Sequence, residues 1–224
     1  MTPLSIVKNN AEILLFAPGE EARYEPQWFA PKAVLGRAEG RGETLFFQAG
    51  DRQLVLRRYR RAGLAARFSQ EHYLWTGLKN SRPYRELALT QQLFEAGLPV
   101  PKPVAARIVK SAFFYTADLI TERIKEAVAL DKHPAPPWEE IGRTIARFHA
   151  YGLNHSDLNA RNILITDGKV WVIDFDKCSL AEPQETKERA NLERLARSLK
   201  KLGLYHQTEW DRMKSTYTQR LAEQ

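Results

Sequence analysis

The N-terminal half of the chain alternates apolar and polar residues in the way that half-buried strands do. Residues 45–59 fit two strands joined by a turn at residues 49–51, and residues 113–120 are apolar and aromatic enough for another strand. Between them, two leucines four positions apart predict a helix over residues 82–96. Gly97 ends this helix, and three prolines at alternate positions then force an extended path. This half is therefore predicted to be rich in strands, with one helix.

The C-terminal half shows mainly the spacing of amphipathic helices. We predict one helix over residues 138–150, another over residues 185–202 and a third from Thr208. A hairpin interrupts this pattern, because the short apolar runs 163–165 and 170–173 flank an Asp-Gly pair that favours a tight turn.

Composition and charge narrow the class of protein. The 224 residues are 43% hydrophobic, which indicates a globular chain, and no apolar run approaches the roughly 20 residues of a membrane-spanning helix. The first residues lack the features of a secretory signal, and Cys178, the single cysteine, excludes an internal disulfide and favours a reducing interior. The net charge of +7 favours anionic partners: nucleic acid, an anionic membrane surface, or a phosphorylated or carboxylated substrate.

Two neighbouring motifs carry the candidate chemistry, HSDLNARNIL at residues 155–164 and IDFD at residues 173–176. Phosphoryl transfer needs a carboxylate that deprotonates the attacking hydroxyl, and oxygen ligands that hold Mg²⁺ against the nucleotide phosphates. Asp157 is the candidate base. Asn162 and Asp174 are candidate metal ligands, because the predicted hairpin returns Asp174 beside Asn162.

Each of these residues also has an ordinary structural interpretation. Asp157, Asn162 and Asp174 could simply form or cap turns. Arg161 could neutralise the transferred phosphate or could be a surface charge, and His155 more readily packs and orients the loop than acts as an acid or base. The two motifs with a hairpin between them are far more restrictive than an isolated HxD, and they favour the catalytic interpretation.

HSDLNARNIL resembles the catalytic loop of the protein-kinase-like superfamily, and IDFD resembles its metal-binding DFG element. Arg57 falls where that superfamily has the lysine of its VAIK strand, and Glu86 falls where the partner glutamate lies, although Arg58 could contact phosphate instead. The segment GRAEGRG resembles the phosphate lid through three glycines, Gly36, Gly40 and Gly42.

This resemblance extends from about residue 30 to residue 202. It implies an α+β, two-lobed protein-kinase-like fold that uses ATP and Mg²⁺. The N-terminal antiparallel sheet lobe, residues 1–120, is expected to bind nucleotide, and the reduced, mostly helical lobe, residues 121–224, is expected to be catalytic. The two lobes form a single kinase-like domain in this interpretation.

Departures from the superfamily pattern point to a compact kinase for a small molecule or a glycolipid. Ser156 replaces the arginine that senses a phosphorylated activation loop, and Asp176 replaces the DFG glycine. Only about eight residues separate Asp176 from the next predicted helix, which leaves no room for a peptide-binding activation segment.

The phrases LVLRRYRRAGL, LPVPKPVAAR, LITERI, HSDLNARNILI and VIDFDKC resemble the bacterial 3-deoxy-D-manno-octulosonic acid (Kdo) kinases of the lipopolysaccharide core sugar kinase family. The resemblance implies ATP-dependent phosphorylation of the 4-hydroxyl of Kdo on a lipid A precursor. The expected location is peripheral, on the cytoplasmic face of the inner membrane. A kinase for heptose, a soluble sugar or an aminoglycoside, and a nucleotide-binding pseudokinase, are the alternatives.

Partners follow from the charge and from this resemblance. Six arginines lie between residues 52 and 67 with no acidic residue among them, as in a solvated strand or in a surface for anions. We expect contact with an anionic membrane surface, no nucleic acid and no obligate protein partner. The residues expected to face the membrane are basic or aromatic: Arg58, Arg60, Arg61, and Trp28, Phe29 or Trp75.

Overall fold

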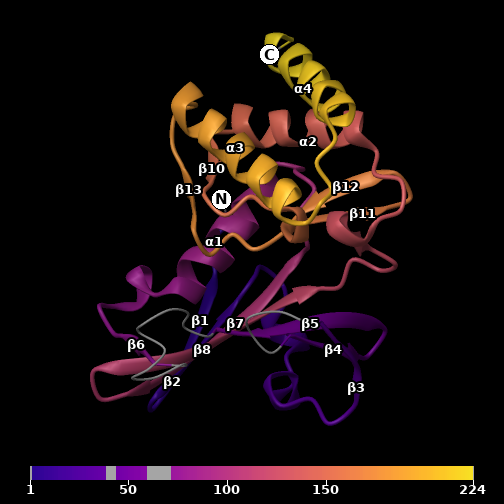
Figure 1. Ribbon diagram of the computed structural model, residues 1–224. Coiled ribbons are helices and arrows are strands. Elements are labelled where there is room, and N and C mark those ends of the chain that lie inside the picture. The colour runs from indigo at the N-terminus through magenta and orange to yellow at the C-terminus, as the bar shows by residue number, and fades with distance from the viewer. Residues whose placement is uncertain (1, 39–43, 60–71, 224) are drawn as a thin grey trace. The chain divides into compact units, whose positions relative to one another are not determined.

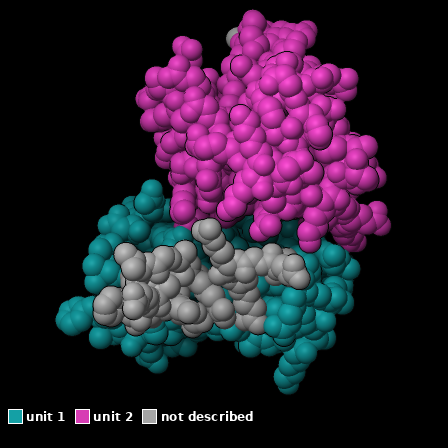
Figure 2. All heavy atoms as spheres, viewed as in Figure 1, with its two compact units in different colours: residues 1–95, 101–123 teal, residues 96–100, 124–224 magenta. Residues whose placement is uncertain are grey.

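The structure is a computed structural model that describes residues 2–38, 44–59 and 72–223. The chain divides into two compact units (Figure 2). Unit 1 comprises residues 1–95 and 101–123, and unit 2 comprises residues 96–100 and 124–224.

Unit 1 is built on an antiparallel sheet in the order β1-β2-β7-β8-β5-β4-β3, with β6 paired to β8 (Figure 1). Its elements are β1 Ser5–Asn9, β2 Glu12–Phe16, β3 Val34–Ala38, β4 Thr44–Ala49, β5 Arg52–Arg58, β6 Tyr73–Leu74, α1 Arg82–Glu95, β7 Pro103–Ser111 and β8 Phe114–Glu122.

Both faces of this sheet are buried. Successive residues of β2 point to opposite faces, so Leu14 and Phe16 join one hydrophobic cluster while Ile13 and Leu15 join the other. Leu87 of α1 packs in the second cluster. A strand covered on both sides needs apolar residues at consecutive positions, which explains the run EILLF of β2.

The predicted strands at residues 45–59 and the predicted helix at residues 82–96 are confirmed as β4, β5 and α1. The N-terminal hairpin β1–β2 was not predicted. β1 is mostly exposed at the edge of the sheet, so its sequence carries little hydrophobic alternation. β7 was treated only as an extended, proline-rich path, whereas it is a nine-residue strand that begins at Pro103. A proline suits that first position because a strand can start without an N–H donor.

Unit 2 is mainly helical, as predicted. Its long elements are α2 Trp138–Ala150, α3 Glu185–Lys201 and α4 Gln207–Ala222. Its short strands are β9 Val128–Ala129, β10 Leu153–His155, β11 Ile163–Thr166, β12 Lys169–Val172 and β13 Cys178–Leu180. β11 pairs with β12 and β9, and β10 pairs with β13, so two small sheets support the loop that links β10 to β11.

The prediction that Trp28 and Phe29 face a membrane is wrong. Trp28 is 3% exposed and Phe29 is 1% exposed, and both belong to a hydrophobic cluster of unit 1. Both lie in a 3-10 turn, Pro26–Phe29, whose aromatic side chains pack in the cluster with residues of β2, β4 and β5. Their burial favours a role in folding, since a buried aromatic side chain cannot enter a lipid interface.

The described arginines of this cluster, at residues 52–58, have acidic partners that are distant in sequence. Arg52 pairs with Glu20 at 2.8 Å, and Arg58 Nε lies 3.9 Å from Asp118. The local sequence shows no counter-charge because the partners come from other elements, the turn after β2 for Glu20, α1 for Glu86 and β8 for Asp118. Arg60, Arg61 and Arg67 lie outside the described residues.

Candidate active site

The hairpin β11–β12 brings the two predicted metal ligands to neighbouring backbone positions. Ile163 pairs with Val172, and the Ile173 N–H donates to the Asn162 carbonyl at 3.0 Å. Asp167 and Gly168 both have positive φ, 48° and 72°, as a tight two-residue turn of this kind requires. Asp174 is the residue after Ile173, so it leaves the hairpin directly beside Asn162.

The loop before β11 is held by bonds from side-chain amides to one carbonyl. Asn162 Nδ2 donates to the Asp157 carbonyl at 3.0 Å, and Asn159 Nδ2 donates to the same oxygen at 2.8 Å. Because the nitrogen of the Asn162 amide is used in this way, its Oδ1 is left as the acceptor end of the group. An amide oxygen and the Asp174 carboxylate are the kind of ligands that Mg²⁺ takes.

His155 anchors the same loop from inside. The side chain is buried, its Nε2–H donates to the Ile173 carbonyl at 3.1 Å, and its ring packs on Phe175 with centroids 5.7 Å apart. Burial lowers the pKa of His155, which keeps the imidazole neutral. The side chain therefore joins β10 to the residue before Asp174, in agreement with the predicted packing role.

Asp157 lies between two cationic side chains that the sequence analysis did not identify. Its side chain is 26% exposed, Arg194 of α3 donates to Oδ1, and Lys177 Nζ lies 3.8 Å from Oδ2. Lys177 stands close after the IDFD motif, which is a usable sequence signal. Arg194 is 37 positions from Asp157 on a highly charged helix, and only folding brings it to the site.

Arg161 has a partner on another loop. Its Nε lies 3.0 Å from Oδ2 of Asp131, a residue that the sequence analysis passed over. The Asp131 side chain is 8% exposed, and its Oδ1 has no hydrogen-bond partner among the described residues. The Arg161 side chain is 66% exposed, and Asp131 neutralises its charge.

Asp174 has a backbone conformation that is uncommon for a residue with a side chain. Its φ is 66°, in the left-handed region, and its side chain is half-buried. Such conformations cost roughly 1–3 kcal/mol and are common at functional sites, where the surrounding structure imposes them. Here the hairpin on one side and the buried Phe175 on the other hold the residue in place.

Unit 1 contains the predicted pair of Arg57 and Glu86. The Arg57 guanidinium donates to Glu86 Oε2 of α1, and this pairing is confirmed. The Tyr59 hydroxyl donates to the same carboxylate oxygen, and burial followed by the Glu86 charge raises the pKa of Tyr59 well above its usual value. Arg57 also lies over the Tyr59 ring, 4.9 Å from its centroid.

The three glycines of the predicted phosphate lid are described only in part. Gly36 lies in β3, where an added Cβ would stand in ordinary contact with Phe46 at 3.4 Å. Gly40 and Gly42 lie outside the described residues. Their binding of phosphate stays a prediction.

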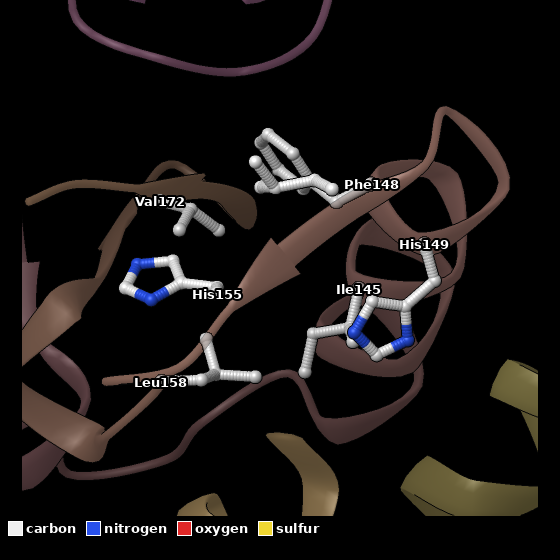
Figure 3. Close-up of a pocket in the computed structure, with 7 residues that line it drawn as sticks. Ile145, Phe148, His149, His155, Leu158 and Val172 are labelled. Atoms are coloured by element: carbon white, nitrogen blue, oxygen red, sulfur yellow. The ribbon is translucent and has the colours of Figure 1, made fainter. Parts of the chain in front are cut away.

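A small cavity lies in the interior of unit 2, lined in part by His155 and Leu158 of the HSDLNARNIL segment. Its volume is about 10 Å³, and seven residues line it, among them Phe148 and His149 of α2, His155 of β10 and Val172 of β12 (Figure 3). That volume is near the lower limit for a single water molecule. The cavity is therefore a packing defect of the core and not a substrate site.

Comparisons with known proteins identify the family. The model of the lipopolysaccharide kinase (Kdo/WaaP) family matches residues 25–217. The chain belongs to this family. A relative from Vibrio parahaemolyticus serotype O3:K6, described as 3-deoxy-D-manno-octulosonic acid kinase, is 43% identical over 206 residues, which cover 89% of this chain and 86% of that protein.

Solved structures show the fold of this Kdo/WaaP family member. WaaP in complex with acyl carrier protein superposes with a TM-score of 0.58 at 20% identity, covering 94% of this chain and 90% of that one. The Rio2 kinase of Chaetomium thermophilum, solved as an ADP/Mg²⁺-phosphoaspartate complex, gives 0.53 at 18% identity, covering 84% and 63%. The predicted family and the predicted protein-kinase-like α+β fold are confirmed.

As a member of the Kdo/WaaP family, the chain is a phosphotransferase with an alcohol group as acceptor.

Two features are absent from the part of the chain that the structure describes. It contains no helix long and apolar enough to cross a bilayer. It also contains no group of three or more His, Cys, Asp or Glu side chains that could hold a metal.

Proposed function

We propose that this protein is an ATP-dependent kinase that phosphorylates the 4-hydroxyl of Kdo on a lipid A precursor, such as Kdo-lipid IVA. The observation that carries the kinase chemistry is the hairpin hydrogen bond from Ile173 to Asn162, which sets Asp174 next to Asn162 at the end of the Asp157 loop. The acceptor is supported by the relative described as 3-deoxy-D-manno-octulosonic acid kinase, which is 43% identical.

Asp157 is the base of this mechanism. Its carboxylate orients the acceptor hydroxyl and accepts its proton as the new O–P bond forms. The amide bonds of Asn159 and Asn162 to the Asp157 carbonyl hold the backbone of the loop, so the carboxylate is presented from a fixed position. His155 supports the same geometry through its bond to the Ile173 carbonyl, and its burial fits this packing role.

Asn162 Oδ1 and Asp174 would hold Mg²⁺, which supplies charge neutralisation at the transferred phosphate. In unit 1, Glu86 and Tyr59 orient Arg57, and this arginine would pair with the phosphates of ATP. Arg58, whose Nε lies 3.9 Å from Asp118, is the alternative candidate. The solved Rio2 kinase complex with ADP and Mg²⁺ supports this cofactor pair through the shared fold.

Replacing Asp157 by asparagine tests the assignment. Asparagine keeps the shape of the side chain but cannot accept the proton, so Asp157→Asn is expected to lower kcat about a thousandfold or more, with ATP binding retained. The assay follows labelled phosphate from ATP to purified Kdo-lipid IVA and locates it on the sugar. Lys169→Gln, on the exposed turn side of the hairpin, is the matched control. Retained turnover in Asp157→Asn would contradict the proposed mechanism.

A lipid-linked acceptor requires contact with a membrane surface, and the β7–β8 hairpin of unit 1 is the part suited to it. Phe113 at its tip is 77% exposed, Phe114 is 43% exposed, and Leu74 of β6, which pairs with Phe114, is 58% exposed. Lys110 lies 4.8 Å from the centroid of the Trp75 ring beside them. Exposed apolar residues next to a cation and an indole favour the interface of an anionic bilayer.

A further inference from the structure

The carboxylate of Asp157 is engaged by cations on both of its oxygens. Arg194 donates to Oδ1, and Lys177 Nζ lies 3.8 Å from Oδ2. Arg194 is 45% exposed and Lys177 is 61% exposed, so a substrate can reach both charges. A carboxylate in this state shares its charge with two cations, whereas a catalytic base directs a lone pair to the acceptor hydroxyl.

Both cations stand on supports that fix them beside the catalytic loop. Arg194 lies one helical turn after Asn191, whose Oδ1 accepts the N–H of His155 at 2.8 Å and whose Nδ2 donates to Asn154 at 2.9 Å. The backbone of Lys177 accepts a hydrogen bond from the Ser156 hydroxyl at 2.7 Å. The two charges therefore belong to the architecture of the loop and are not surface charges that meet Asp157 by chance.

The other cation of the loop is already neutralised by a more buried partner. Arg161 pairs with Asp131, whose side chain is 8% exposed. Arg194 and Lys177 have only the half-exposed Asp157 as an ionic partner among the described residues. An anion that enters next to Asp157 would meet these two charges first.

We propose that Arg194 and Lys177 form the binding site for the carboxylate of the acceptor sugar. This inference rests on the proposed function and deepens it, because Kdo is a sugar acid and a neutral sugar has no such group. The guanidinium of Arg194 can bind a carboxylate through two parallel hydrogen bonds, and Lys177 adds a point charge. When the acceptor takes these cations, the carboxylate of Asp157 becomes available to the hydroxyl. Binding of the acceptor carboxylate to these two cations would thus both select an acidic sugar and release the base.

The experiment compares two acceptors, Kdo-lipid IVA and the same compound with the Kdo carboxyl group converted to its neutral methyl ester. For the wild-type protein, we expect the ester to have a kcat/KM lower by about tenfold or more. For Arg194→Gln, we expect the KM of the acid to rise by about tenfold or more with the KM of ATP unchanged, and the preference for acid over ester to disappear. Lys177→Gln should reduce the same preference more weakly.

Arg189→Gln is the matched control, since Arg189 is an exposed arginine of the same helix that lies 3.9 Å from Glu193. It should keep the wild-type preference. If Arg194→Gln is poorly folded, Arg194→Lys retains the charge and should keep most of the preference while losing the paired hydrogen bonds. An Arg194→Gln protein that prefers the acid as strongly as wild type would overturn this inference. A wild-type protein that phosphorylates neither acceptor would instead overturn the proposed function.

Discussion

His149 is a buried titratable residue in the interior of unit 2. Its Nε2 lies 3.3 Å from Asn191 Oδ1 and its Nδ1 lies 2.9 Å from the Tyr217 hydroxyl, so the ring joins α2 to α3 and α4. Burial lowers the pKa of His149 to about 4. The same Asn191 side chain accepts the N–H of His155, so this network also supports the catalytic loop.

This residue predicts acid sensitivity. The unfolded chain binds a proton at His149 near pH 6.5, whereas the folded protein does so only near pH 4, so the free energy of unfolding falls as the pH drops between these values. His149 alone contributes a loss of about 2 kcal/mol between pH 7.5 and pH 5, and His155, also lowered, acts in the same direction. Urea unfolding at a series of pH values measures this loss.

The variant His149→Gln should flatten that dependence, because glutamine can still donate to Asn191 and does not titrate. His133→Gln, at a partly exposed histidine before α2, is the control and should leave the dependence unchanged. An equally steep pH dependence in His149→Gln would show that other groups are responsible.

At the scale of elements, the crossing of α2 and α4 depends on one glycine. A Cβ added to Gly142 would stand 2.2 Å from the carbonyl oxygen of Met213 and 2.5 Å from the Thr216 hydroxyl. The Thr216 hydroxyl in turn lies 3.1 Å from the Glu139 carbonyl. The backbones of α2 and α4 can approach this closely because glycine has no side chain at the crossing point.

Gly142→Ala is therefore expected to destabilise the protein by about 1–3 kcal/mol, the usual cost of overpacking. Helix propensity alone predicts the opposite, a gain of about 1 kcal/mol for alanine over glycine. Urea unfolding of the variant decides between them, with Lys214→Ala on the exposed side of α4 as control. A more stable Gly142→Ala would show that the two helices can move apart at little cost.

The sequence predicted the elements that depend on neighbouring residues, and it missed those that depend on residues far apart in the chain. The β11–β12 hairpin depends on an Asp-Gly turn between apolar runs, and α2 depends on local spacing, so both were accessible. β10 and β13 have three residues each and exist because they pair across 25 positions of sequence. No local pattern marks such strands.

At the scale of the whole molecule, the net charge is distributed unevenly. Unit 1 contains eighteen Lys and Arg against twelve Asp and Glu, and unit 2 contains sixteen against fifteen. Nearly all of the +7 therefore belongs to the unit that also carries the exposed Phe113 and Phe114. In the proposed contact with a membrane, long-range attraction and apolar insertion would therefore act on the same unit.

We expect the protein to bind vesicles containing anionic lipid and to bind more weakly as salt rises, because the attraction is screened. The double variant Phe113→Ser, Phe114→Ser should lower the affinity by about tenfold or more, since two apolar side chains no longer enter the interface. Vesicle sedimentation measures both effects. Tyr151→Ser with Leu202→Ser, a matched loss of two exposed apolar residues in unit 2, is the control. Equal binding by the Phe113, Phe114 variant and wild type would exclude this hairpin as the contact.

The sequence by itself determined the family and the α+β class, through motifs and periodicity spread along the chain. It also determined the candidates Asp157, Asn162 and Asp174, because these depend on motifs and a turn within some twenty residues. Only the tertiary structure decided that Trp28 and Phe29 are buried, that distant carboxylates neutralise Arg52 and Arg58, and that Arg194 reaches Asp157. The physical reason is range: turn chemistry and periodicity act between near neighbours in sequence. Burial and ion pairing depend on neighbours in space, which the chain acquires when it folds.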